Sequence, residues 1–312
     1  MIKVKNLIKT YGNFTALDKV NFEVEKSTIH GLLGENGAGK TTTMRCLLGL
    51  TYADSGEMYI NDDLVARKNN YIRKKVSYLA GDFRPYENFT AQNYFKYILS
   101  IENNISKKYL ELAERFKLDL RKKIKELSKG NKQKVGIIQA FMKDPQILIL
   151  DEPTSVLTPQ EAQSLFETLN ILSKRGCAIL YISHKLHEIK KICHAATILR
   201  AGRVVANCDP SKEPIKKMAE LLVGSQLPEI NRGRLTAHGV ERIHIENLNY
   251  TSKDPFSVKL KNISFTVRGG EILGIAGVAG NGQTELMSVL SGEVKDLDEP
   301  SIIKFNDQIV TS

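Results

Sequence analysis

The sequence predicts an α/β protein with a parallel central sheet, an antiparallel β subdomain, an inserted helical subdomain and a partial second copy of its opening part at the C-terminus. Three observations lead to this fold class. Short apolar strands alternate with segments of helical period along residues 1 to 225. A glycine-rich loop joins one of these strands to a helix. The chain also matches itself after a shift of 243 positions, which indicates an internal repeat.

The glycine-rich loop fits the pattern G-x-x-x-x-G-K-[ST], which binds phosphate groups. Residues 28–33 before it are predicted as a buried strand and residues 42–48 after it as a helix, which is the context that the pattern requires. Backbone N–H groups would surround phosphate oxygens, Lys40 would reach the β- and γ-phosphates, and the Thr41 hydroxyl would bind Mg²⁺. The loop residues are Gly34, Glu35, Asn36, Gly37, Ala38, Gly39, Lys40 and Thr41.

Length and composition are those of an ordinary folded protein. The chain has 312 residues, of which 42% are hydrophobic and 26% are charged. It has no run of eighteen apolar residues and no signal-peptide stretch, so we expect a cytosolic protein whose connection to a membrane runs through a partner. The net charge of +10 is compatible with polyphosphate, anionic lipid or nucleic acid and does not choose among them.

The elements around the loop follow from local sequence patterns. Residues 2–4 and 20–24 alternate as strands with a turn at Gly12-Asn13 between them, and residues 57–60 and 76–79 form two more strands. Residues 90–126 change to helical period and predict the inserted subdomain. Another helix opens at Leu127-Ser128-Lys129-Gly130-Asn131.

Two apolar strands end in residues suited to catalysis. Residues 147–150 deliver Asp151 and Glu152, and residues 178–182 lead to His184. Asp151 suits Mg²⁺ coordination, Glu152 can orient and deprotonate a water molecule, and His184 can hydrogen-bond a γ-phosphate. Between the strands, Thr158-Pro159-Gln160-Glu161 predicts a capping box that opens a helix. Together with Lys40 and Thr41, these residues predict a phosphoryl-transfer site.

The internal repeat is incomplete. Gln283 stands where the first copy has Lys40, and the sequence ends before any counterpart of the strands that lead to Glu152 and His184. We therefore predict a complete domain at residues 1–225, a linker at 226–242 and the truncated start of a second, degenerate copy at 243–312. Four residues of the loop recur in the second copy, as Gly277, Gly280, Gly282 and Thr284.

The motifs and their order resemble those of the ATP-binding-cassette (ABC) ATPases. Gly34 to Thr42 is similar to their Walker A segment, Leu127 to Asn131 to their signature sequence, and Ile147 to Glu152 to their Walker B segment with its catalytic glutamate. His184 resembles their switch histidine, and Tyr11 resembles the aromatic residue that stacks on adenine. The resemblance implies a P-loop NTPase with a RecA-like parallel core at residues 1 to 225.

The resemblance also implies an ATPase that uses ATP and Mg²⁺. ATP would contact Tyr11 and residues 34 to 42, and Mg²⁺ would bind Thr41 and Asp151. Such domains act as head-to-tail dimers, with a second copy or with another ATPase, and Ser128 and Gly130 would serve the partner's nucleotide. The catalytic residues would be Glu152, His184, Lys40, Ser128 and Gly130.

The implied partners are transmembrane permease subunits, reached at the cytoplasmic face of the cell membrane, and a substrate-binding protein. Nucleic acid is not an expected partner. The loop after Leu79, with Phe83, Tyr86 and Phe89 nearby, is where coupling to the permease is expected.

The sequence departs from the family pattern at three positions. Gly81 stands where the family usually has a glutamine at the end of the strand at 76–79. Lys129 replaces the second signature glycine, although Ser128 and Gly130 remain, and Thr158 replaces an aspartate that many members have after Walker B. The first departure puts one ligand of Mg²⁺ and water in doubt.

Several functions stay open at this point. Residues up to about 150 look more like the ATPases of drug or polymer exporters, whereas residues from Thr154 onward look like the tandem ATPases of sugar and nucleoside importers. A shortened or recombined tandem ATPase of an importer explains both. An exporter ATPase, or a remnant without independent transport function, is the alternative. A cassette acting on ribosomes or DNA would need two complete copies or a long coiled-coil insertion.

Overall fold

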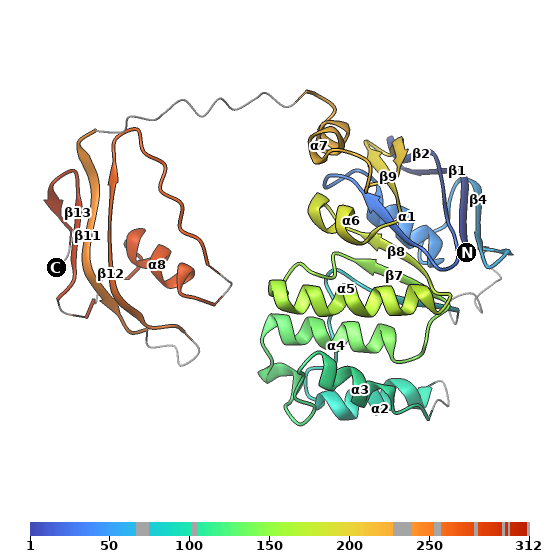
Figure 1. The fold of residues 1–312 in the computed structure, drawn as a ribbon, viewed down its shortest axis with the longest axis horizontal. Helices are drawn as coiled ribbons and strands as arrows, with labels where there is room; N and C mark the ends of the chain where they lie inside the picture. Colours follow the sequence, from blue (N-terminus) through green and yellow to red (C-terminus); the bar gives the residue numbers. More distant parts are fainter. Residues whose placement is uncertain are drawn as a thin grey trace. The chain divides into compact units, whose positions relative to one another are not determined.

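The computed structural model describes residues 1–66, 75–101, 105–226, 239–252, 257–277, 280–294, 297–298 and 300–310. The chain divides into two compact units, Met1–Leu227 and Pro228–Ser312 (Figure 1). Each unit has its own sheets and its own apolar core. Most of the predicted linker at 226–242 lies outside the described residues.

The larger unit is built on a six-stranded sheet in the order β10-β9-β3-β8-β7-β6. All its strands run parallel except β10, which pairs antiparallel with β9. The predicted strands at 28–33, 76–79, 147–150 and 178–182 are confirmed. The strands are β3 (Ile29–Leu33), β6 (Val76–Leu79), β7 (Ile147–Asp151), β8 (Ala178–Ile182), β9 (Ala195–Arg200) and β10 (Arg203–Cys208).

Apolar cores cover both faces of this sheet, which explains why its strands are apolar throughout. Leu148 and Leu150 of β7 belong to the core on the helical side. Ile147 and Ile149 belong to the core on the other side. Because successive side chains of a strand point to opposite faces, each strand stabilises both cores.

A four-stranded antiparallel sheet in the order β2-β1-β4-β5 shares the second core. Met44 and Leu47 of helix α1 (Lys40–Leu47) are buried in that core, so the helix that follows the glycine-rich loop lies against both sheets. The predicted turn at Gly12-Asn13 joins β1 to β2. The strands are β1 (Ile2–Tyr11), β2 (Phe14–Val24), β4 (Ser55–Ile60) and β5 (Asp63–Leu64).

The helices of the larger unit cover the other face. Figure 1 shows α5 next to β7, α4 beyond α5, and α2 and α3 beyond α4. The predicted capping box of α5 is confirmed, because the Glu161 N–H donates to Thr158 Oγ1 (3.3 Å) and the Thr158 N–H donates to Glu161 Oε2 (2.8 Å). The helices are α2 (Ala91–Ile101), α3 (Lys108–Arg115), α4 (Lys129–Phe141), α5 (Pro159–Lys174), α6 (Leu186–Ile192) and α7 (Ile215–Val223), with a 3₁₀ turn at Ile124–Glu126.

The smaller unit has a four-stranded antiparallel sheet in the order β12-β11-β13-β14 and one helix in its described part. This order is equivalent to β2-β1-β4-β5 of the larger unit. Its elements are β11 (Glu241–Tyr250), β12 (Leu260–Arg268), α8 (Gln283–Leu290), β13 (Ile302–Phe305) and β14 (Gln308–Ile309).

Left-handed backbone conformations recur at equivalent places in the two units. Lys19 and Asn262 both have φ of 50°, and Gly39 and Gly282 have φ of 103° and 98°. Residues 271–277, the counterpart of β3, form no strand. Consequently Ile272 is 90% exposed, whereas its counterpart Ile29 is fully buried between β8 and β9.

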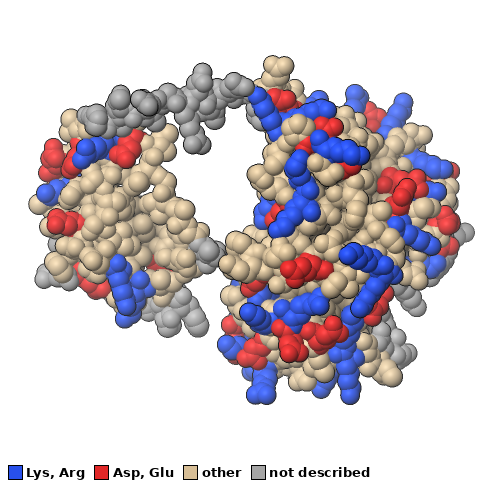
Figure 2. Space-filling model, viewed as in Figure 1, with Lys and Arg blue, Asp and Glu red and all other residues tan. Residues whose placement is uncertain are grey.

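Charged side chains of both signs are interspersed on the face of the molecule shown in Figure 2. Some of the lysines in the basic stretch between Arg121 and Lys134 are paired with acids. Lys132 contacts Glu87 at 2.7 Å, and the buried Lys134 contacts Glu161 at 2.5 Å. That stretch is therefore partly neutralised within the fold.

Candidate site at the carboxyl ends of the parallel strands

The glycine-rich loop runs from the end of β3 to the start of α1. A Cβ atom at Gly34 would lie 2.7 Å from the Ala38 Cβ, and one at Gly39 would lie 2.7 Å from Leu17 Cδ2. Gly37 instead has open space around it and needs glycine for its φ of 83°. The loop is therefore packed tightly on its protein side and open at Gly37.

Lys40 is held under this loop. Its ammonium Nζ donates to the carbonyl oxygens of Gly34 (2.6 Å) and Glu35 (3.0 Å), and only 8% of the residue is exposed. Burial lowers the pKa of Lys40, and the nearby carboxylates of Glu152 and Asp151 act in the opposite direction. A buried cation beside backbone N–H donors is an arrangement that favours a bound anion.

Asp151 and Glu152 lie at the carboxyl end of β7. Burial raises the pKa of Asp151, and the negative charge of Glu152 raises it further. Thr41, the second residue of α1, supplies a hydroxyl. Among the residues that the structure describes, no group of three or more His, Cys, Asp or Glu side chains could hold a metal ion. One hydroxyl and one carboxylate are oxygen ligands that fit Mg²⁺ when phosphate oxygens and water complete its shell.

His184 contacts Glu152 directly. Its Nδ1 lies 2.7 Å from Glu152 Oε1, and the Ser183 hydroxyl donates to Glu152 Oε2 at 3.4 Å. Glu152 has φ of 46°, and its N–H donates to the carbonyl of Ile182 at the end of β8. Two neighbouring strand ends thus bring together an acid and an imidazole, as sequence reasoning predicts.

Gly81 follows β6 and faces Asp151. A Cβ atom at Gly81 would lie 3.5 Å from Asp151 Oδ2, which is an ordinary contact distance, so the fold has room for a side chain there. The carboxylate of Asp82 is exposed and lies 3.9 Å from Arg84. Its charge contributes to the raised pKa of Asp151, although less than burial and Glu152 do.

Ser128 caps the N-terminus of α4. The Asn131 N–H donates to Ser128 Oγ at 3.3 Å, and a Cβ atom at Gly130 would lie 3.0 Å from the carbonyl oxygen of Val156. In the described part of the chain, no hydrogen bond or ion pair joins Ser128 or Gly130 to the glycine-rich loop. Among the described residues, these two predicted residues contact Asn131 and Val156 and not the cluster around Lys40.

Tyr11 is half-exposed at the end of β1. Lys9 Nζ lies 5.4 Å from the centre of its ring, and Tyr11 is paired across the hairpin with the exposed Phe14. Two exposed aromatic residues thus occupy the tip of the β1–β2 hairpin. Sequence reasoning named Tyr11 alone, because Phe14 reaches the same tip only through the strand register.

Sequence reasoning also missed a set of polar residues behind Glu152. Gln133, Thr154, Tyr181 and Glu188 join the turn after β7 to α4, β8 and α6. Thr154 and Glu188 are polar residues that follow the ends of β7 and β8 in the sequence, whereas Gln133 lies within α4 and Tyr181 within β8. The contacts among them depend on the strand order, which the sequence does not predict.

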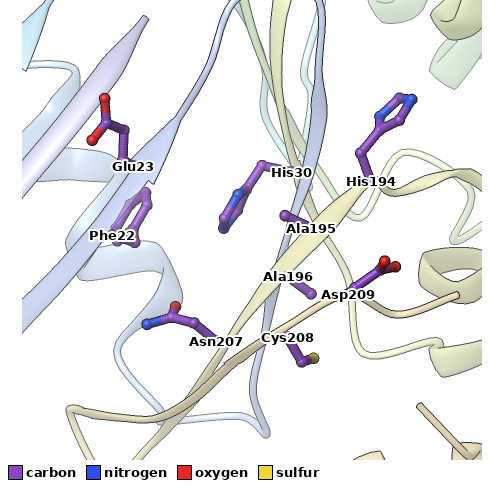
Figure 3. Close-up of a pocket in the computed structure, with 9 residues that line it drawn as sticks. All are labelled: Phe22, Glu23, His30, His194, Ala195, Ala196, Asn207, Cys208 and Asp209. Atoms are coloured by element: carbon purple, nitrogen blue, oxygen red, sulfur yellow. The ribbon is translucent and has the colours of Figure 1, made fainter. Parts of the chain in front are cut away.

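A separate pocket of about 470 Å³ lies near the amino end of β3, away from the glycine-rich loop at the carboxyl end (Figure 3). His30 is buried there, its Nε2 lies 2.9 Å from Thr197 Oγ1, and the Thr197 hydroxyl donates to Asn207 Oδ1 at 2.7 Å. Burial lowers the pKa of His30 to about 4. The pocket is lined by Phe22, Glu23, His30, His194, Ala195, Ala196, Asn207, Cys208 and Asp209, none of which the sequence singles out for catalysis.

Residues 17–155 match the family model described as ABC transporter. The chain is 35% identical over 320 residues to the nucleoside import ATP-binding protein NupA of Lactococcus lactis, and this alignment covers 99% of this chain and 63% of NupA. It is 33% identical over 311 residues to the ribose import ATP-binding protein RbsA of Clostridium tetani, and that alignment covers 94% of this chain and 60% of RbsA. The chain thus spans about three fifths of the length of these curated relatives.

Solved structures resemble about seven tenths of the chain. One described as an ATP-binding subunit of an ABC transporter has a TM-score of 0.64 at 30% identity and covers 72% of this chain and 95% of that chain. A dimeric ATP-binding cassette bound to ADP and phosphate has a TM-score of 0.62 at 23% identity and covers 67% and 99%. The second likeness supports the fold alone.

Proposed function

Because the chain belongs to the ATP-binding proteins of the ABC transporter family, we propose that its larger unit binds ATP with Mg²⁺, hydrolyses it, and energises transport through separate membrane subunits. The observation that carries this proposal is the contact between His184 and Glu152 beside the buried Lys40. This contact supports the proposal because a carboxylate that could accept a proton and a cation lie at one edge of the sheet, where a phosphate chain on the glycine-rich loop would end.

In this proposal, each part of the nucleotide has its own residues. The adenine ring stacks on Tyr11, the phosphates lie on the N–H groups of residues 34 to 42, and Lys40 turns from the Gly34 and Glu35 carbonyls to the β- and γ-phosphates. Thr41 and Asp151 would hold Mg²⁺. Bound Mg²⁺ neutralises charge on the phosphate oxygens.

Glu152 orients the attacking water and takes its proton on the carboxylate. His184 keeps the Glu152 side chain in place through Nδ1 and turns its other ring nitrogen to the γ-phosphate. Ser128 and Gly130 lie at the N-terminus of α4, and no described hydrogen bond or ion pair joins them to this set. We assign them to the nucleotide of a second cassette in a head-to-tail dimer, in which they would stabilise the γ-phosphate.

The partners follow from the same proposal. No described helix is both long and apolar enough to cross a membrane. We propose that permease subunits contact the cluster of exposed aromatic rings at Tyr86, Phe89 and Tyr97, whose centroids lie 5.7 to 5.9 Å apart. Such an apolar patch on α2 and the segment before it is typical of a protein interface, and it would place the unit at the cytoplasmic face of the membrane.

We propose import of a sugar or nucleoside, with a substrate-binding protein as a further partner. Support comes from the relatives, since the proteins NupA and RbsA are described as nucleoside and ribose import ATP-binding proteins. Residues 243–312 are proposed to be the start of a second, degenerate cassette. The equivalent strand order and the recurring left-handed residues support this assignment.

The proposal is tested by phosphate release from ATP and Mg²⁺ with the purified full chain, the wild type beside Glu152→Gln. The variant keeps the size of the side chain and removes the proton acceptor. We expect it to bind ATP with unchanged affinity and to lose turnover by about 10²-fold or more. Equal turnover in both proteins would refute the role of Glu152, and absence of ATP binding by the wild type would refute the proposal as a whole.

A further inference from the structure

A polar cluster outside the predicted site ties the turn after Glu152 to the start of α6. The Thr154 hydroxyl donates to both carboxylate oxygens of Glu188, at 2.8 and 2.7 Å. The Tyr181 hydroxyl donates to Glu188 Oε2 at 2.7 Å. Lys185 Nζ lies 3.3 Å from Glu188 Oε1 and donates to the carbonyl and hydroxyl oxygens of Thr154, both at 3.1 Å. The Glu188 carboxylate thus contacts three donor side chains, those of Thr154, Tyr181 and Lys185.

The cluster is largely buried, with Glu188 and Lys185 partly exposed, and its hydrogen bonds are satisfied. Thr154 and Tyr181 are almost fully buried, and no described buried side-chain polar atom lacks a partner. Burial is the main cause of the raised pKa of Tyr181, so its hydroxyl stays a donor. Buried networks in which every member is satisfied hold their elements rigidly, whereas removing one member leaves the others unpaired.

The turn that this cluster holds is conformationally strained. Glu152 adopts a left-handed φ of 46°, which costs a residue with a Cβ free energy and persists only where neighbours impose it. Gln133 of α4 donates to the Pro153 carbonyl at 3.3 Å. Glu188 of α6 accepts from the Thr154 hydroxyl. These two side chains, from two different helices, thus bind residues 153 and 154 directly after the proposed proton acceptor.

We infer that Glu188 is a positioning residue for ATP hydrolysis, which keeps the turn at Glu152 and the segment at His184 in register through Thr154, Tyr181 and Lys185. Lys185 follows His184 in the chain and Thr154 follows Glu152 by two residues, so the same carboxylate contacts a side chain close in sequence to each partner of the contact between His184 and Glu152. Glu188 itself touches neither of these side chains. The inference rests on the proposed ATPase function of the larger unit.

The test compares Glu188→Gln and Thr154→Val in the full chain by ATP hydrolysis, ATP binding and amide hydrogen exchange. We expect kcat to fall about tenfold or more while KM and the ATP Kd change by less than about twofold, since a small misplacement of a catalytic group affects the chemical step. When Glu152→Gln is already present, adding Glu188→Gln should not lower kcat any further. Thr168→Val is the matched control, because Thr168 is a buried threonine on α5 whose hydroxyl donates to the Ser164 carbonyl.

Hydrogen exchange keeps the inference distinct from the proposed function. The Ser155 and Leu157 N–H groups donate within the turn to the carbonyls of Glu152 and Thr154. In Glu188→Gln their exchange should accelerate by about tenfold or more, and in Thr168→Val it should not. Unchanged exchange at both amides overturns the inference, as does a loss of kcat equal to that of the control. A wild type without ATPase activity but with the expected exchange pattern would instead refute the proposed function and leave Glu188 as the residue that holds the turn.

Discussion

The Nδ1 atom of His184 lies 2.7 Å from Oε1 of Glu152, across the ends of two adjacent parallel strands. Because an ionised carboxylate only accepts hydrogen bonds, Nδ1 carries the hydrogen when Glu152 is charged. The other ring nitrogen is then left for a ligand, and the side chain of His184 is 60% exposed. The carboxylate of Glu152 and the imidazole of His184 therefore hold each other in place, and the second ring nitrogen of His184 stays available to a ligand.

The first prediction concerns this pair as a unit. We expect His184→Ala to lower kcat of ATP hydrolysis about tenfold or more, and the double variant with Glu152→Gln to be no slower than Glu152→Gln alone, because both act on the same step. Steady-state phosphate release from the four proteins measures this. Multiplicative losses would mean that the two side chains act separately.

Lys40 should be needed for nucleotide affinity and not for stability. Its ammonium is buried against carbonyl oxygens, so replacing it with an apolar residue of similar length relieves desolvation while removing a charged donor to phosphate. We expect Lys40→Met to weaken ATP binding about 10- to 100-fold and to leave the melting temperature equal or higher. Calorimetric titration and thermal unfolding measure both, with the exposed Lys26→Met as control.

Stability should fall in mild acid because of His30. Its pKa is lowered by burial to about 4 in the folded protein, whereas the unfolded chain takes up this proton near the usual value of about 6.5. The unfolded state therefore binds more protons as pH falls from about 6.5 to 4, and the free energy of unfolding drops by about 2 kcal/mol between pH 7 and 4.5 from this group alone. Urea unfolding of wild type and His30→Gln at both pH values measures the difference. His194 is exposed, so the control variant His194→Gln should lose as much free energy of unfolding between pH 7 and 4.5 as the wild type does. An equal loss in His30→Gln would contradict the assignment of this pH dependence to His30.

The two equivalent isoleucines should differ in their importance for stability. Ile29 is fully buried in β3 and Ile272 is 90% exposed. We expect Ile29→Ala to lower the free energy of unfolding of the larger unit by about 2–5 kcal/mol and Ile272→Ala to change that of the smaller unit by less than about 0.5 kcal/mol. Chemical unfolding followed by hydrogen exchange assigns each loss to its unit. A large loss from Ile272→Ala would show that residues 271–277 are packed in solution.

Much of the fold could be predicted because its signals are local. The apolar runs at 147–150 and 178–182 predict strands, and Thr158 with Glu161 predicts a capping box. The structure confirms all three. The glycine-rich loop was recognisable because Gly34 and Gly39 meet neighbours that leave no room for a Cβ.

What could not be predicted depends on contacts between distant parts of the chain. Thr154 and Glu188 are far apart in sequence, and only the adjacency of β7 and β8 brings them together. The buried network of His30, Thr197 and Asn207 likewise needs the order β10-β9-β3. The exposure of Ile272 follows from the absence of paired strands beside residues 271–277, which no local pattern encodes.

The central claim, a site shared between two cassettes, is tested most directly by mixing two inactive variants. Lys40→Ala removes the phosphate-binding cation, and Ser128→Arg blocks the start of α4. In a head-to-tail dimer of one copy of each, both defects fall in the same site and the other site is intact. We predict no ATP hydrolysis by either variant alone and recovery to about a quarter of the wild-type rate in an equal mixture, since half of the dimers would carry one intact site. A mixture as inactive as its components, with both variants folded, would contradict the shared site.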